Sequence, residues 1–337
     1  MTDLSLKYLS LLFLFVLLPG LVSADLSKFE ELKPVEEHLR MISDTYKFAR
    51  FESEVSNPIE GANGNVYPVT LSFLFFGDEN ILPFINDMEK LQGSDISLRV
   101  YAISVSPTAE SRPADHEPLL SASIIASVCN GPEASGKPLF RTALLEAALN
   151  KDSFTFGVQR KQAVEGIDLW LSSFRLGHAD KDAVMITFTG CAFKFAKITE
   201  YINRLATADA KMEIMANSIN STQYSGIPVY RFDLAAVEGK DHPLPRHAMS
   251  IIDLIDTAVS SSNGRISSLR IAPPIRIKDI FGLPIELSVE NLVIDEWNAL
   301  KRTLSELKGE KVSVTGISDK GMTDEGFTIR LKVVVEP

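Results

Sequence analysis

The residues best suited to chemistry fall in two short clusters around histidine side chains. The clusters are His178-Ala-Asp180-Lys-Asp182 and Asp241-His242 with His247. A histidine beside carboxylates can be oriented for proton transfer, and the same residue types can hold a metal ion. Both clusters lie in polar segments between apolar runs, where histidine and aspartate are ordinary solvated residues. We therefore interpret both as surface loops and assign no catalytic, cofactor-binding or metal-binding residue.

Common catalytic motifs are missing from the sequence. It contains no GxSxG elbow, HExxH helix, Walker loop or GxGxxG turn. Ser225, in Tyr224-Ser-Gly, has no neighbouring base and reads as a turn residue. The Asn220-Ser-Thr glycosylation signal has meaning only in a eukaryotic secretory pathway. An enzyme would therefore need a site assembled from residues far apart in the chain.

The two cysteines, Cys129 and Cys191, have neither zinc-knuckle nor redox-pair spacing. In an oxidising compartment they have the option of pairing. Closing a loop of about 60 residues would stabilise the fold by roughly 4 kcal/mol on the chain-entropy model. The alternative is two separate buried thiols that behave as small apolar side chains.

The composition is that of a folded, acidic protein. Apolar residues make up 45% of the 337 residues, and 44 Asp and Glu against 34 Lys and Arg give a formal net charge of −10. No block of Lys and Arg is present, so the sequence lacks the electrostatic footprint of a nucleic-acid-binding protein. The acidity favours solubility.

The N-terminus carries a short apolar run. No charged residue occurs from Tyr8 to Val22, Lys7 precedes the run, and Pro19-Gly20 interrupts it. This length and the small residues before Asp25 are typical of a secretory signal cleaved after Ala24. The alternative is an uncleaved membrane anchor over residues 8–24. Both predict an extracytoplasmic protein, periplasmic or secreted, that touches the membrane only through this segment if it stays.

One pattern is repeated three times along the rest of the chain. An apolar run beginning at Val69, Val184 or Ile285 leads into a segment with apolar residues every three or four positions, and then into an alternating run. These periods predict a strand, a helix with one buried stripe, and another strand. A further strand closes each copy, starting at Ser121, Pro228 and Phe327.

A predicted helix precedes each copy, starting at Pro34, Lys161 and Ala248. The third copy then reads αββαββ, which is a ferredoxin-like βαββαβ order with its first strand moved to the end. We expect an α+β fold of tandem ferredoxin-like modules, with helices on one face of antiparallel sheets. The expected division is a signal or anchor at 1–24, module 1 at 25–131, module 2 at 138–240 and module 3 at 246–337.

The run from Leu269 to Val335, LRIAPPIRIKDIFGLPIELSVENLVIDEWNALKRTLSELKGEKVSVTGISDKGMTDEGFTIRLKVVV, resembles the periplasmic domains of PilO-type subunits. PilN and GspM-like subunits are related to them. These proteins align the inner-membrane platform of type IV pilus and type II secretion machines. The resemblance implies a circularly permuted ferredoxin-like domain, no catalytic residues, no cofactor and partners from a bacterial envelope complex.

Two surfaces are candidates for contact with partners. The run Phe73-Leu-Phe75-Phe76 predicts core packing between modules, with a protein interface or an apolar-ligand groove as alternatives. The C-terminal strand from Phe327 would pair with a partner or a second copy if it lay at a free edge. We expect a non-enzymatic assembly or scaffold protein of the envelope. The alternative is a secreted or periplasmic soluble binding module unrelated to pili.

Overall fold

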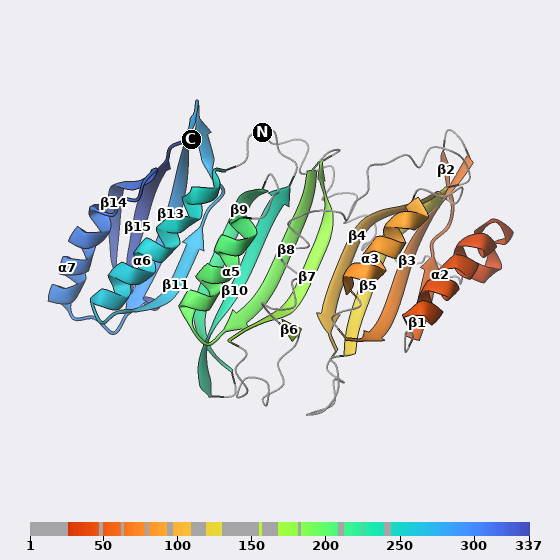
Figure 1. The fold of residues 1–337 in the computed structure, drawn as a ribbon, viewed down its shortest axis with the longest axis horizontal. Coiled ribbons are helices and arrows are strands. Elements are labelled where there is room, and N and C mark those ends of the chain that lie inside the picture. The colour runs from red at the N-terminus through yellow and green to blue at the C-terminus, as the bar shows by residue number, and fades with distance from the viewer. Residues whose placement is uncertain are drawn as a thin grey trace.

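The computed structural model describes residues 26–46, 50–61, 64–77, 81–92, 97–108, 119–129, 155–156, 168–180, 183–207, 212–224, 226–238 and 244–337. They form an α+β structure in which a long, mainly antiparallel sheet is covered by helices (Figure 1). Among these residues no helix is both long and apolar enough to cross a membrane. The predicted signal or anchor at 1–24 lies outside the described residues, and the division into modules stays a prediction.

The helices of the described part are α2 (Lys33–Thr45), α3 (Ile81–Gln92), α5 (Phe195–Thr207), α6 (Ser250–Ser261) and α7 (Ile294–Ser305), with short 3-10 turns η1 (Leu26–Lys28), η2 (Glu30–Leu32) and η5 (Arg246–Met249). The strands within module 1 are β1 (Arg50–Val55), β2 (Ile59–Gly61), β3 (Gly64–Phe76), β4 (Ser97–Pro107) and β5 (Leu119–Cys129). Those within module 2 are β6 (Thr155–Phe156), β7 (Leu169–Asp180), β8 (Ala183–Ala192), β9 (Met212–Tyr224) and β10 (Ile227–Glu238). Module 3 has β11 (Arg265–Ile271), β12 (Ile275–Ile277), β13 (Ile280–Glu290), β14 (Val312–Thr323) and β15 (Gly326–Val335).

The sheet runs in the order β1-β3-β5-β4-β7-β8-β10-β9-β11-β13-β15-β14. Leaving aside the short strands β2, β6 and β12, each module contributes four neighbouring strands. In every module the first strand lies beside the second, the second beside the fourth, and the fourth beside the third. The same local order is therefore used three times in one sheet.

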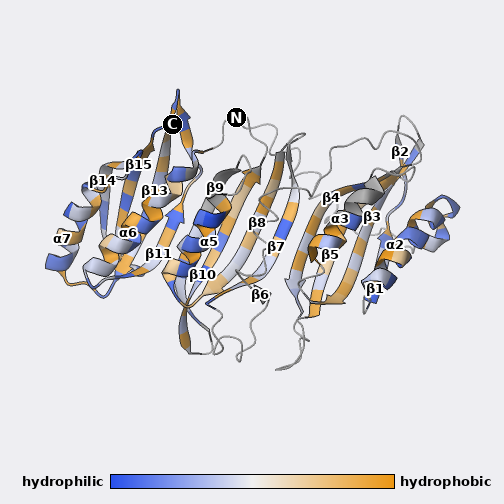
Figure 2. Cartoon of the chain, in the orientation of Figure 1, coloured by the Kyte–Doolittle hydropathy of each residue, from blue (hydrophilic) through white to orange (hydrophobic). Residues whose placement is uncertain are grey.

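The described helices all lie on one face of this sheet (Figure 1). Each buries an apolar stripe, as the three-or-four spacing predicts: Leu39 and Ile42 in α2, Ile198 and Ile202 in α5, and Leu300 in α7 are all almost fully buried. Figure 2 shows apolar stretches along the strands of all three modules and polar residues on the outward sides of α2, α5 and α7. The opposite face of the sheet carries none of the described helices.

The aromatic run at the end of β3 divides between the two faces. Phe73 and Phe75 are buried against Phe84 of α3, with ring centroids 5.1 and 5.9 Å away, while Phe76 is 46% exposed. Side chains alternate along a strand, so one half of the run joins the core under α3. The leading prediction for this run was core packing between modules, whereas Phe73 and Phe75 pack within module 1, against its own helix α3.

The expected helix beginning at Lys161 is wrong from Leu169 onward. Residues 157–167 lie outside the described part, but Leu169–Asp180 is strand β7 and pairs along its length with β8. Phe174 and Leu176 are buried and Arg175 between them is exposed, which is a strand period. The helical pattern of this segment is weak, and pairing with β8 outweighs it, so the segment forms a strand.

The segment SDKGMTDEG is rich in Gly and Asp, residue types that predict a loop between the last two strands. SDKGMTDEG does not separate the last two strands as a loop, because β14 continues to Thr323 and only Asp324 and Glu325 remain as the turn. Gly326 follows with φ of +104°, a conformation that glycine adopts without steric cost. The C-terminal strand β15 pairs with β13 on one side and β14 on the other. It is an interior strand, so the pairing mechanism proposed for it at a free edge is wrong.

Neighbouring modules join through short ladders of four residues. In the first, Ala102–Val105 of β4 pair with Phe174–Gly177 of β7; in the second, Asn217–Asn220 of β9 pair with Ser268–Ile271 of β11. A contact between helices reinforces the second joint, where Asn203 Nδ2 of α5 donates to Asp253 Oδ2 of α6 at 2.6 Å. The three copies therefore make one continuous sheet.

Candidate functional site

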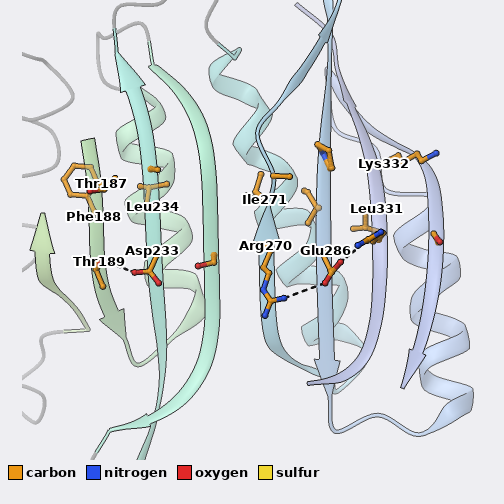
Figure 3. Close-up of a pocket in the computed structure, with 17 residues that line it drawn as sticks. Thr187, Phe188, Thr189, Asp233, Leu234, Arg270, Ile271, Glu286, Leu331 and Lys332 are labelled. Carbon is orange, nitrogen blue, oxygen red and sulfur yellow. Dashed lines mark hydrogen bonds and ion pairs between the residues drawn. The ribbon is translucent and has the colours of Figure 1, made fainter. Parts of the chain in front are cut away.

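A trough of about 920 Å³ opens on the helix-free face of the sheet, where modules 2 and 3 meet (Figure 3). In the close-up the helices lie behind the strands, and polar residues such as Asp233, Arg270 and Glu286 lie on the side that faces the viewer. The lining comes from seven strands: Thr187, Phe188 and Thr189 of β8, Ser218 of β9, Asp233, Leu234 and Ala235 of β10, Arg270 and Ile271 of β11, Ala272 after it, Pro284, Ile285 and Glu286 of β13, Ser318 of β14, and Arg330, Leu331 and Lys332 of β15.

The floor of the trough is made by small side chains. Ser218, Ala235 and Ala272 lie between the two walls, and their larger neighbours Leu234 and Ile271 are buried on the helix side. Because side chains alternate along each strand, the large apolar side chains point towards the helices. At these three positions short side chains face the trough. The joint between β9 and β11 therefore runs along a shallow floor.

One wall is a charged cluster centred on Glu286. Its carboxylate accepts hydrogen bonds from Lys320 Nζ at 2.5 Å and Arg330 Nε at 2.9 Å, and Arg270 Nη1 lies 3.8 Å away. Hydrogen bonding by Lys320 and then by Arg330 lowers the pKa of Glu286. Arg270 also binds Glu325 at 2.7 Å. Three cations thus share one central carboxylate.

The cluster carries surplus positive charge. Lys332, next on the same face of β15, is exposed and has no hydrogen bond or ion pair from its side chain within the described part of the chain. Four cations, Arg270, Lys320, Arg330 and Lys332, stand against the two carboxylates of Glu286 and Glu325. In a protein with a net charge of −10, this wall is locally positive and suits an anionic group.

The opposite wall is polar and smaller. Thr189 Oγ1 donates to Asp233 Oδ1 at 2.8 Å, and Arg231 lies 3.7 Å from the same carboxylate oxygen. Cys191 stands opposite Arg231 in the β8–β10 register. Burial raises the pKa of its thiol to about 11. The thiol is therefore protonated at neutral pH and is a poor nucleophile.

Cys191 is a free thiol in the structure, so it is not joined to Cys129. Its backbone belongs to β8 in module 2, whereas Cys129 ends β5 in module 1. Of the two alternatives left open by the sequence, the structure shows the unpaired one for Cys191. The side chain of Cys129 lies outside the described part.

The histidine clusters lie away from the trough or outside the described residues. His178 and Asp180 belong to the end of strand β7, not to a loop, and their side chains are not described. Asp182, Ser225, Asp241 and His242 fall outside the described residues. His247 lies in η5 near the C-terminus, its Nε2 2.7 Å from the carbonyl oxygen of Glu336. Within the described ranges no group of three or more His, Cys, Asp or Glu residues is placed to hold a metal ion.

The charged cluster around Glu286 could not be predicted from the sequence. Arg330 and Lys332 alternate with apolar residues on β15, so their outward orientation can be predicted from the sequence. Glu286 on β13 and Arg270 on β11 also follow this alternation. Nothing in the local sequence shows that β11, β13 and β15 lie side by side, and that order assembles the cluster.

Comparison with known proteins gave no relatives: no family model, no curated protein and no solved structure matches this chain.

Proposed function

We propose that this protein is a non-enzymatic scaffold that works outside the cytoplasm and joins other components of an envelope machine. The observation that carries the proposal is the continuous sheet, in which three similar modules share backbone ladders at both joints. Such a construction gives a long, stiff body with a broad open face. Within the described part, the trough lining offers no histidine and no activated nucleophile.

Each module is, on this proposal, a circularly permuted ferredoxin-like domain. The ferredoxin-like fold places its first and third strands in the centre, with the fourth beside the first and the second beside the third. Moving the first strand to the end gives the order first, second, fourth, third. That order occurs in all three modules, which supports the assignment. Module 3, with α6, β11, β13, α7, β14 and β15, supplies the complete αββαββ sequence.

The resemblance of Leu269–Val335 to PilO-type domains suggests the kind of machine. A PilO-like role would place the chain beside the membrane-embedded platform of a type IV pilus or type II secretion system. Its partners would then be other subunits of that complex, with residues 1–24 as export signal or anchor. The three joined modules would act as a spacer of fixed length.

Co-expression tests the scaffold directly. The full-length chain is produced together with the proteins encoded by its flanking genes and purified by a tag in mild detergent. We expect at least one envelope subunit to co-purify in a fixed ratio, and not with an equally tagged unrelated periplasmic protein. Flanking genes without any envelope subunit, together with no co-purifying product, would contradict the scaffold role.

The trough favours a second candidate function, a soluble binding module for anionic ligands. Its volume of about 920 Å³ is at the upper end of the range of small-molecule sites, roughly 300–1,000 Å³. Titration calorimetry with citrate as the probe tests it. Replacing both Arg330 and Lys332 by alanine should weaken binding by about tenfold or more, since each pairing with a charged group contributes on the order of 1 kcal/mol. The exposed Lys28→Ala change is the control, and the absence of heat with wild-type protein rejects this candidate.

A further inference from the structure

The two joints between modules obey one rule. In each, the third strand of one module pairs antiparallel with the first strand of the next: β4 with β7, and β9 with β11. A β-bulge precedes the joining residues of the third strand in both cases, at Tyr101 in β4 and Met215 in β9. A bulge increases the local twist and redirects the edge of the strand. The two joints thus share the same strand pairing and the same preceding β-bulge.

The residues that meet in the two joints are also of the same kinds. In the first joint, Ile103 pairs with Leu176 and both are fully buried; in the second, Ile219 pairs with Leu269, again fully buried. Beside each apolar pair lies a serine opposite an arginine.

These hydrophilic pairs are Ser104 with Arg175, and Ser218 with Arg270. They stand on the helix-free face, because they are offset by one position from the buried pairs. Both joints therefore combine an apolar pair towards the helices with a serine–arginine pair on the open face, and the serine follows the isoleucine in β4 but precedes it in β9.

The two strands at the ends of the sheet, β14 and β1, are of the two kinds that pair in each joint: a third strand and a first strand. Among the described strands, β14, the third strand of module 3, pairs only with β15, and β1, the first strand of module 1, pairs only with β3. Residues 307–309 also bond to the outer edge of β14, but only along Val312–Val314. A bulge at Thr315 precedes Ile317 and Ser318 on β14. β1 begins with Arg50 and Phe51.

The residues at these ends match those of the first joint in kind and in order. Ile317 stands opposite the buried Leu331 of β15 and is itself 38% exposed, as an apolar residue without its partner would be. Ser318 lines the trough on the open face. On β1, Phe51 stacks on Phe73 on the helix side, with ring centroids 5.0 Å apart, which places Arg50 on the open face.

We propose that a second copy of this chain adds head to tail, with β14 of one copy pairing antiparallel with β1 of the next. Antiparallel pairing sets Ile317 opposite Phe51 and Ser318 opposite Arg50, so an apolar pair and a serine–arginine pair form together. The inference deepens the proposed scaffold function, on which it rests, by naming the chain itself as a partner. The sheet then continues from copy to copy by the rule used within one copy.

The helix layer supports the same contact. At the joint between modules 2 and 3, Asn203 on α5 binds Asp253 on α6. The buried positions align Ile198 and Tyr201 of α5 with Trp297 and Leu300 of α7, which makes Arg302 the equivalent of Asn203.

On the receiving side, Ile251, Ile255 and Ala258 of α6 correspond to Val35, Leu39 and Ile42 of α2. The equivalent of Asp253 is then Glu37. Arg302 and Glu37 are both exposed and opposite in charge, so the contact between copies would be an ion pair where the internal joint has an amide–carboxylate hydrogen bond.

The contact is heterologous, because it uses a different surface on each copy. Heterologous contacts produce rings or open chains instead of closed dimers. We therefore expect wild-type assemblies whose mass rises with protein concentration.

A lysine at the edge tests the contact. In the full-length chain, Ile317→Lys places a charge in the apolar pair and should leave the protein monomeric at concentrations where the wild type associates. The control is Met322→Lys on the same strand, which is 71% exposed and lies beyond the proposed pair; it should associate like the wild type. Light scattering gives the mass, and urea unfolding shows that both variants are folded. Equal loss of association in both variants would overturn the proposed register.

Mixing distinguishes head-to-tail chains from symmetric dimers. Ile317→Lys keeps an intact β1, so it should cap wild-type assemblies and lower their mean mass. If β14 instead paired with β14 of another copy, the variant would be excluded and the wild-type mass unchanged.

Cysteine cross-linking fixes the register. In a background with Cys129→Ser and Cys191→Ser, the double change Arg50→Cys and Ser318→Cys should form disulfide-linked oligomers on mild oxidation, since opposed positions have Cβ atoms about 4.5–5.5 Å apart. Neither single change should do so. Dimers from Ser318→Cys alone would refute the proposal. A wild-type chain that stays monomeric at about 100 µM, where even contacts with a dissociation constant of about 100 µM are detected, would refute it as well. A monomer that still co-purifies with an envelope subunit would refute self-assembly and leave the scaffold function standing.

Discussion

At the scale of single residues, Glu286 is the carboxylate that three cations share on the open face of module 3. Its neighbours lower its pKa, so its carboxylate stabilises the fold above the unfolded-state pKa of about 4.3 and loses that contribution as the pH falls through the lowered folded-state value. We predict that Glu286→Gln, which leaves three cations without their shared carboxylate, costs about 1–2 kcal/mol at pH 7. Urea unfolding from pH 7 to pH 3 should show the difference from wild type shrinking at the acidic end.

The matched control lies on the same strand. Glu290 has one ion pair, with Arg265 at 3.5 Å, and is more exposed. Glu290→Gln should therefore change the free energy of unfolding by less than about 0.5 kcal/mol. Equal effects of the two substitutions would show that the Glu286 cluster adds nothing. A difference that persists unchanged at pH 3 would show that the effect of Glu286 does not come from its charge.

At the scale of one element, strand β8 can pack against its neighbours only if position 190 lacks a side chain. A Cβ built on Gly190 would come within 2.5 Å of the carbonyl oxygen of Trp170 on β7 and of the Phe232 ring on β10. We predict that Gly190→Ala destabilises the protein by about 1–3 kcal/mol through overpacking, measured as a lower midpoint in urea. Gly316→Ala is the control, because its Cβ would meet only Lys332 side-chain atoms at 3.6 Å or more. A Gly190→Ala midpoint equal to that of the control would contradict this packing.

At the scale of the whole molecule, pairing is much more extensive within modules than between them. In module 3 alone Phe281–Val289 pair with Phe327–Val335, whereas each joint uses four residues of each strand. The segments 132–138 and 238–246 are rich in Gly, Pro and polar residues, so we predict that limited proteolysis cuts there. Pieces of roughly 100 residues should appear on a denaturing gel yet elute together on native gel filtration, held by the joints. A single resistant core without these cuts would argue against three modules.

Much of the local structure could be predicted from the sequence. The apolar stripes of α3, α5 and α7 follow the spacing of residues such as Phe84, Ile198 and Leu300, and the final strand follows the alternation of Arg330 and Lys332 with apolar neighbours. The failures occur where two periods compete or where a turn is short. Leu169–Asp180 became a strand because β8 offers a pairing partner, and the last hairpin needs only two turn residues because β14 is held by β15.

The sequence by itself determined which residues share a face of a helix or strand, because side-chain direction is a local property of the backbone. It also indicated that one βαββ pattern recurs, since each copy carries the same order of periods. Only the tertiary structure decided which strands are neighbours, because strand pairing joins residues that are distant in the chain and leaves no local signal. That decision places Ser218 of module 2 opposite Arg270 of module 3, gathers Arg270, Lys320 and Arg330 around Glu286, and makes β14, not β15, the end of the sheet.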